Sequence, residues 1–94
     1  MATQSTATID FGTNGATDAS VTVTGQAGFV AGTNLVEAWI SPLATSNNTA
    51  DNHWFESLDR PMIINPITGV GFTIVLKCNF GRAFGQYNLG WVYN

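Results

Sequence analysis

Apolar and polar side chains alternate along several short stretches of this chain, with the two-residue period of a β-strand that buries one face. In residues 69–78 the apolar positions of one face are Phe72, Ile74, Leu76 and Cys78. In residues 85–93 the corresponding positions are Tyr87, Leu89, Trp91 and Tyr93. The connection between the two stretches contains Gly81, which suits a turn. We therefore predict that they pair as an antiparallel hairpin, onto which the upstream chain packs.

Four further stretches show strand-like patterns upstream. Residues 6–11 and 19–24 alternate cleanly, and the second stretch has an outer face of hydroxyl side chains. Residues 34–40 hold apolar groups on both faces, which predicts either a strand buried on both sides or one at a subunit contact. Residues 53–64 predict two short strands or one irregular strand, and residues 65–69 predict a turn.

Helix is disfavoured throughout the sequence. No apolar pattern with a 3.6-residue period continues for three turns, and the chain contains 12 threonines and 10 glycines. The sequence predicts an all-β fold, a single-domain antiparallel β-sandwich or jelly-roll-like barrel of about six to eight short strands. The domain takes in residues 1–94, of which residues 1–6 form either an arm laid on a neighbouring molecule or a frayed end.

Charged residues make up only 10% of the 94 residues, against roughly 25% in an average soluble domain. Threonine, asparagine, serine, glutamine and glycine must therefore form most of the surface. Charge repulsion usually keeps small domains apart, so this surface favours association with a partner. The net charge of −3 argues against nucleic acid as that partner, and the lack of a long apolar run argues against a membrane.

Cys78 is the single cysteine, so the chain can form no internal disulfide. Its place on a predicted buried face indicates a small apolar side chain rather than a reactive thiol. The first residues have neither the basic nor the apolar segment of a signal peptide. We expect a complete small gene product without an export signal.

Residues 51–56 contain the only cluster of residue types that catalyse reactions or bind metals. In an extended segment Asp51 and His53 lie on one side about 6.6 Å apart, close enough to share an ion or a proton, and Glu56 joins them if the backbone bends. Alternatively, Asp51 ends a loop and His53 forms hydrogen bonds locally or across a subunit boundary. One histidine with no second histidine is poor support for a transition-metal site, so we predict no metal and no cofactor.

No pattern indicates catalysis, and we predict that the protein is not an enzyme and has no catalytic residues. The serines lack a nucleophile elbow, and His53 is the single candidate base. No spacing singles out two of the six carboxylates for glycoside hydrolysis. Residues 69–71 lack the helix and the lysine of a phosphate-binding loop.

Five aromatic residues have two alternative uses, a platform on which sugars stack or packing in the core and at subunit contacts. They are Trp39, Trp54, Tyr87, Trp91 and Tyr93. We favour packing, because it is the commoner use of such residues. Glu37 and Arg60 form either a pair across strands or subunits, or two solvated edge charges.

Five segments, taken in order and with their spacing, resemble a group of small virion proteins and domains of tailed bacteriophages. The segments are residues 21–26, 36–39, 49–53, 69–74 and 85–92, and the similarity spans roughly residues 20 to 93. Members of the group are short stand-alone products or lie near the ends of fibre-like proteins. Relatives tend to carry an acid where this chain has Asn52, which weakens any ion site carried over from them.

The resemblance implies a structural virion protein, most like a head decoration or cement protein on the outside of the phage capsid, made in the host bacterial cytoplasm. Its implied partners are the major capsid protein and other copies of itself, as a homotrimer in preference to a dimer. Alternatives are a tail fibre or receptor-binding module that holds carbohydrate, and a tail adaptor. The interface candidates are Trp39, Asp51, His53, Trp54, Phe80, Arg82, Tyr87 and Trp91.

Overall fold

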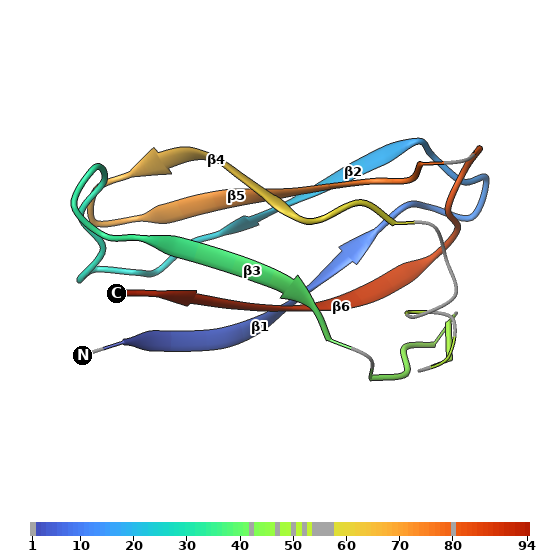
Figure 1. The fold of residues 1–94 in the computed structure, drawn as a ribbon, viewed down its shortest axis with the longest axis horizontal. Helices are drawn as coiled ribbons and strands as arrows, with labels where there is room; N and C mark the ends of the chain where they lie inside the picture. Colours follow the sequence, from blue (N-terminus) through green and yellow to red (C-terminus); the bar gives the residue numbers. More distant parts are fainter. Residues whose placement is uncertain are drawn as a thin grey trace.

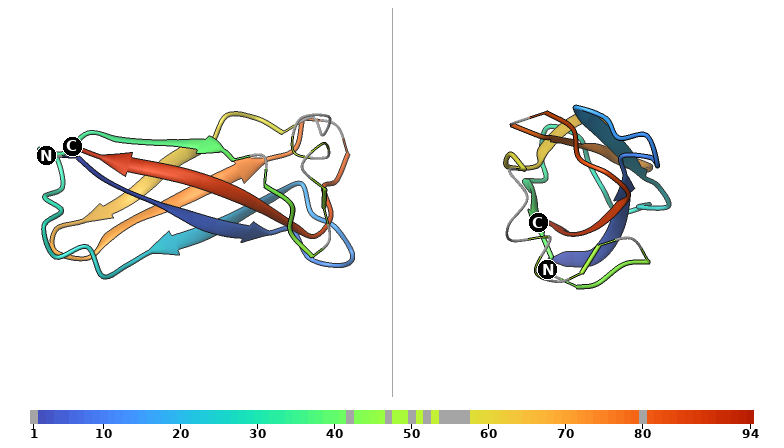
Figure 2. Two further views of the ribbon diagram at one scale, coloured as in Figure 1. Left: turned by 90° about the horizontal axis from the view of Figure 1, so that it is seen from below. Right: turned by 90° about the vertical axis from the view of Figure 1, so that its right-hand side faces the viewer.

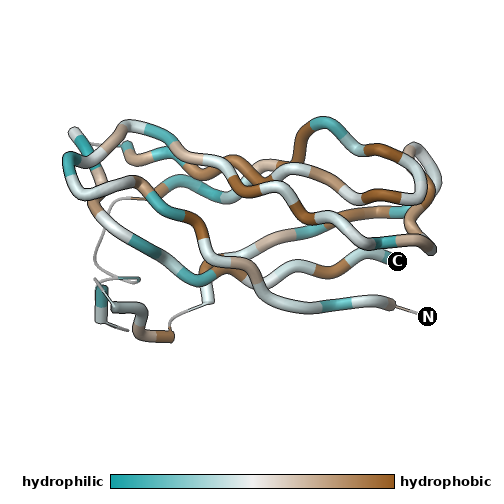
Figure 3. Tube along the Cα trace, turned by 180° about the vertical axis from the view of Figure 1, so that it is seen from behind, coloured by the Kyte–Doolittle hydropathy of each residue, from teal (hydrophilic) through white to brown (hydrophobic). Residues whose placement is uncertain are grey.

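The computed structural model describes residues 2–41, 43–46, 48–49, 51, 53, 58–79 and 81–94. Six β-strands run through these residues and form two three-stranded sheets that pack face to face (Figure 1). The predicted all-β sandwich is therefore confirmed. Apolar and polar residues alternate along much of the chain, as the coloured tube in Figure 3 shows.

Each sheet is built around one central strand, after which we name it. The β6 sheet has the order β1-β6-β3, with β1 at Thr3–Asp10, β6 at Gln86–Tyr93 and β3 at Val36–Ile40. The β5 sheet has the order β2-β5-β4, with β2 at Asp18–Val23, β5 at Gly71–Lys77 and β4 at Met62–Ile67. All four ladders are antiparallel. In Figures 1 and 2 the two sheets form the two layers of an elongated sandwich.

The core lies between the sheets and consists of the inward-facing alternate residues. From the two central strands these are Phe72, Ile74, Leu76, Tyr87, Leu89, Trp91 and Tyr93. Phe72 meets Trp91 across the gap with ring centroids 5.4 Å apart. Phe29, which follows β2, closes the core against Phe72 and Tyr93 at centroid distances of 5.6 and 5.2 Å. Each large side chain buried in this way contributes about 1.5–3 kcal/mol to folding.

The predicted hairpin between residues 69–78 and 85–93 is wrong. The two stretches are β5 and β6, which belong to different sheets and face each other across the core. Both strands carry large apolar side chains at their inward positions, and two such faces are buried completely only when they are opposed. Among the six strands, β4 and β5 alone are both consecutive and paired, through the turn at residues 68–70.

Two smaller expectations also change. Residues 3–6 are neither an arm nor a frayed end, because they lie in β1 and the ladder starts with Thr3 opposite Tyr93. The turn expected at residues 65–69 starts later, since β4 continues to Ile67 with an irregularity after Ile64. Asn65 has a φ of 53° at this irregularity, a left-handed conformation that asparagine tolerates better than most residues.

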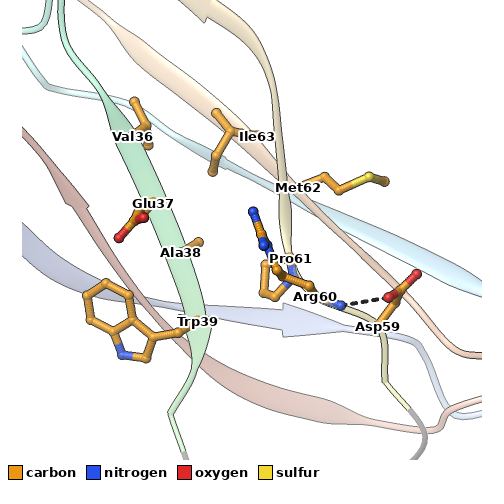
Figure 4. A pocket seen from close by; sticks show the side chains of 9 residues that line it. All are labelled: Val36, Glu37, Ala38, Trp39, Asp59, Arg60, Pro61, Met62 and Ile63. Carbon is orange, nitrogen blue, oxygen red and sulfur yellow. Dashed lines mark hydrogen bonds between the residues drawn. The ribbon is translucent and has the colours of Figure 1, made fainter.

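No ladder joins the two sheets, and on one side of the sandwich the edge strands border a groove. β1 pairs with β6 and β2 pairs with β5, so the pairs are nested as in the wound ribbon of a jelly roll. The third pair of that series, β3 and β4, forms no ladder although the two strands border the same space (Figure 4). Each is therefore an edge strand with a free backbone edge, and we call the space between them the seam.

Candidate interaction surfaces

A groove of about 800 Å³ follows the seam. Its walls are residues 36–39 of β3 and residues 59–63, which lead into β4 (Figure 4). Glu37 and Arg60 both line it, but no ion pair joins these two described residues, so the predicted pair does not form within one chain. The backbone N–H of Arg60, and not its guanidinium, donates to the Asp59 carboxylate at 2.9 Å. The groove is thus lined by one basic residue, Arg60, and two acidic residues, Glu37 and Asp59.

Hydrogen bonds just beyond the ends of β3 show which of its backbone groups face β6. Leu35 and Asn94 exchange two N–H···O bonds of 3.0 Å, and the Ser41 N–H donates to the Asn88 carbonyl at 2.9 Å. Backbone groups of an antiparallel strand point alternately to one side and the other. Odd-numbered residues of β3 therefore direct their N–H and C=O groups to β6, and even-numbered residues direct theirs to the seam.

The even-numbered residues of β3 are Val36, Ala38 and Ile40. None of their N–H or C=O groups has a hydrogen-bond partner among the residues that the structure describes. Their side chains are half-buried and face the core. β3 thus presents three free donor and acceptor pairs in a row to the seam.

The facing edge of β4 is protected. Cys78 donates its N–H to the Thr17 carbonyl at 2.8 Å, so even-numbered residues of β5 direct their backbone groups to β2 and odd-numbered residues direct theirs to β4. Ile63 lies opposite the even-numbered Ile74, and its own backbone groups therefore point away from β5, to the seam. Pro61 has no N–H to offer, and Asn65 departs from strand geometry. Proline and irregular backbone at a sheet edge oppose pairing with a further strand. Of the two edges, β3 is the one ready to accept a strand.

Trp39 lies on the outer face of the β6 sheet, beside the open edge. Its indole covers Gly90 of β6 so closely that a Cβ at Gly90 would collide with the ring. An aromatic side chain laid over a strand glycine shields the bare backbone. The indole is still 43% exposed, and Leu35, on the same face of β3, is 80% exposed. Apolar surface therefore borders the free edge of β3.

A second apolar surface follows β4 and the turn after it. It consists of Met62, Ile64, Ile67 and Val70, each between 38% and 48% exposed, and we call it the β4 row. Met62 and Ile64 point outward because Ile63 between them faces the core. Their ladder partners, Val75 and Thr73, carry no charge. Clustered apolar side chains on an exposed face mark interaction sites more often than scattered ones do.

His53 is a buried residue with two hydrogen bonds and not part of an ion site. Its Nδ1 lies 2.8 Å from the Thr49 carbonyl oxygen, and its Nε2 accepts the Asn88 N–H at 3.0 Å. The accepting role of Nε2 assigns the proton of the neutral ring to Nδ1. The ring also packs edge-on against Tyr87, with centroids 4.9 Å apart. Both nitrogens are engaged, as the local hydrogen-bonding alternative predicted.

The extended arrangement predicted for Asp51 and His53 is wrong. Both residues have helical backbone conformations, and Asp51 is exposed whereas His53 is only 2% exposed. Residues two apart in a helix point to different sides, so the two side chains cannot share an ion. Glu56 lies outside the described residues.

Two further polar residues cover the start of β6 together with His53. The Nδ2 of the buried Asn48 donates to the carbonyls of Phe84 and Gln86 at 2.9 and 2.8 Å. The Thr45 hydroxyl donates to the same Gln86 carbonyl at 2.8 Å. We call Thr45, Asn48 and His53 the β6 cap, because they bond backbone groups at the start of β6, beyond the last residue pair of the ladder with β3.

The structure divides the eight predicted interface residues. Trp39, Asp51 and Arg82 are exposed. His53, Tyr87 and Trp91 are at most 3% exposed, so their predicted place at an interface is wrong. Tyr87 and Trp91 pack in the core, and His53 packs against Tyr87. Trp54 and Phe80 lie outside the described residues. Tyr93 is buried too, so Tyr87, Trp91 and Tyr93 form no sugar-stacking platform and serve packing.

The β4 row was not predicted from the sequence. The signal was present, because residues 62–64 are an uninterrupted apolar run between Pro61 and Pro66. A strand flanked by prolines belongs at a sheet edge, and an edge strand without alternation must expose some of its apolar side chains.

In the part of the chain that the structure describes, no group of three or more His, Cys, Asp or Glu side chains is placed to hold a metal ion. Within the same residues no helix has the length and apolar character needed to cross a membrane. Comparisons with known protein families, with curated proteins and with solved structures find no match.

Proposed function

We propose that this chain is a structural protein of a bacteriophage particle, a decoration or cement protein that binds the outside of the head. The β4 row is the main support for the proposal, because it is an uncharged apolar strip that a partner protein could cover. The rest of the chain also has few charged residues. The bacteriophage setting is supported by the resemblance of the five sequence segments described above. Neither support involves a reaction, so we propose a role without catalysis.

The partner that fits the β4 row is the assembled shell of the major capsid protein. Covering four half-exposed apolar side chains yields about 1 kcal/mol each, enough to anchor a contact of ordinary size but not to form it alone. A protein that binds the assembled shell and not its free subunits stabilises the shell by mass action. Many copies, each adding a modest contact, would together resist the pressure of the packaged DNA.

The experiment adds purified protein to phage heads that lack it and measures co-sedimentation and the temperature of genome release. Wild-type protein should bind and raise the release temperature. Ile64→Lys, which puts a charge into the β4 row, should weaken binding at least tenfold, since a contact with an apolar surface cannot hydrate the ammonium.

Gln4→Lys is the matched control. It adds the same charge at an exposed position of β1 on the other sheet and should bind heads like the wild type. An unchanged release temperature with and without the protein would refute the cement role. Equal binding by the Ile64→Lys and wild-type proteins would refute the β4 row as the contact.

A receptor-binding module is the second candidate, and the exposed indole of Trp39 is the observation that favours it. Aromatic rings laid flat on a surface are where sugars stack. A glycan ligand whose binding is lost in Trp39→Ala would support this role over the cement role. The number of copies in a virion separates them independently, because a head protein follows the capsid lattice and a tail or adaptor protein follows the few-fold symmetry of the tail.

A further inference from the structure

We propose that two copies of this chain pair along the free edges of β3, antiparallel about a two-fold axis at Ala38, so that their β6 sheets join into one. This inference goes beyond the proposed function, since it names a surface and a register by which the chain associates with itself. It does not depend on where the assembly is located.

The backbone pattern of β3 selects this register. With Ala38 opposite Ala38 of a second copy, Val36 lies opposite Ile40, and every free N–H and C=O group faces a partner group. The three opposed pairs each exchange two hydrogen bonds. A shift by one residue would oppose these groups to backbone groups that already bond β6, and a shift by two would lose one of the three pairs. The Ala38-centred register alone uses the whole edge.

The side chains of β3 agree with the same register. On the outer face Glu37 lies opposite Trp39 of the second copy, and Leu35 lies diagonal to that indole. Leu35 and Trp39, 80% and 43% exposed in one copy, therefore gain apolar neighbours. On the inner face the residue at the two-fold axis is alanine, which leaves space where two identical side chains meet.

The protected edge of β4 explains why the second copy presents β3. Pairing of β3 with the β4 of another copy would be head-to-tail and could close a ring such as a trimer. Pro61 and Asn65 restrict the backbone groups that β4 offers for such a ladder. The two-fold arrangement uses the better of the two seam edges twice. The edges thus favour a dimer over the expected trimer.

Cysteine cross-linking in a Cys78→Ser background tests the register. Directly opposite Cα atoms in a hydrogen-bonded pair are about 5.5 Å apart, within disulfide reach. Ala38→Cys should therefore form a covalent dimer on mild oxidation. Val36→Cys is the matched control, because the two copies of residue 36 are displaced by four residues, about 13 Å. Val36→Cys should link only when mixed with Ile40→Cys.

Sedimentation of the unmodified chain and of Ala38→Pro tests the hydrogen bonds. The wild type should sediment as a dimer. Proline removes one free N–H from each copy and should raise the dissociation constant about thirtyfold, the loss expected for two backbone hydrogen bonds. The Ala38 N–H has no partner within the chain, so the circular dichroism of the variant should keep its β signal. If the variant fails to fold, the cysteine experiment decides.

A wild-type chain that is monomeric at all concentrations, or Val36→Cys that links as readily as Ala38→Cys, would overturn the inference. The outcome separates from that of the proposed function. A dimer that does not bind heads removes only the cement role, and a monomer that binds heads removes only the β3 pairing.

Discussion

The structure treats two stretches of unpaired backbone in the β6 sheet differently. At the start of β6, where the ladder with β3 stops, three side chains of the β6 cap occupy the Gln86 carbonyl and the Asn88 N–H. Along β3 itself, three consecutive N–H and C=O pairs face the seam with no partner among the described residues. Burying backbone groups without partners costs free energy, whereas leaving them accessible costs little.

The difference indicates which strand edge is available to a partner. The chain covers one set of backbone groups with a histidine, an asparagine and a threonine, and it blocks the edge of β4 with Pro61. The same devices are missing along β3. An unprotected strand edge is a template for a further strand.

The largest effect should come from His53→Ala in the β6 cap. The change leaves the half-buried Asn88 N–H without its acceptor, removes the contact with Tyr87 and opens a cavity. Together these should lower the free energy of unfolding by about 3 kcal/mol, measured by urea denaturation. His53→Gln, which keeps an acceptor, should lose less. A loss below about 0.5 kcal/mol for His53→Ala would show that the cap does not hold the start of β6.

Asn48→Ala should have the next largest effect. It removes both hydrogen bonds from Nδ2 to the carbonyls of Phe84 and Gln86 and should cost about 2 kcal/mol of unfolding free energy. Asn48→Asp is the informative partner variant, because its carboxylate would face two carbonyl oxygens and should cost more than alanine. The opposite order would mean that Asn48 acts by filling space and not by donating.

The smallest effect should come from Gly90→Ala, next to the open edge. The new methyl group displaces the Trp39 indole, which can swing outward, so the loss should be about 1 kcal/mol. In a double-mutant cycle with Trp39→Ala the two losses should not add, since each variant removes the same contact. Additive losses would show that the indole does not shield Gly90.

The sequence was sufficient for the existence of the strands but not for their partners. Alternation located the central strands because their inward residues are large and their outward residues are mostly polar. The same regularity led to the wrong prediction that these two strands pair with each other. Ile74 and Leu89 could pack against a neighbouring strand of the same sheet or against a strand of the facing sheet. Only the packing of the two complete sheet faces decides between a hairpin and a sandwich.

The interaction surfaces were only partly visible in the sequence. Trp39 was singled out as an aromatic residue on an ambiguous strand, and it is exposed. Tyr87 and Trp91 have the same residue character and are buried, because burial depends on which face of the strand meets the other sheet. The free groups of Ala38 carry no signal at all in the sequence, since they belong to the backbone and depend on the ladder formed with β6.

The last strand of the fold, β6, is the sole ladder partner of both β1 and β3. During synthesis on the ribosome, neither of these strands can find its place until residues 86–93 have emerged, although β2, β4 and β5 can already associate. Such long-range pairing is slow and leaves strand edges unsatisfied in the meantime. Nascent chains should therefore need chaperone protection until β6 has emerged, and a premature stop before residue 86 should yield a product removed by proteolysis.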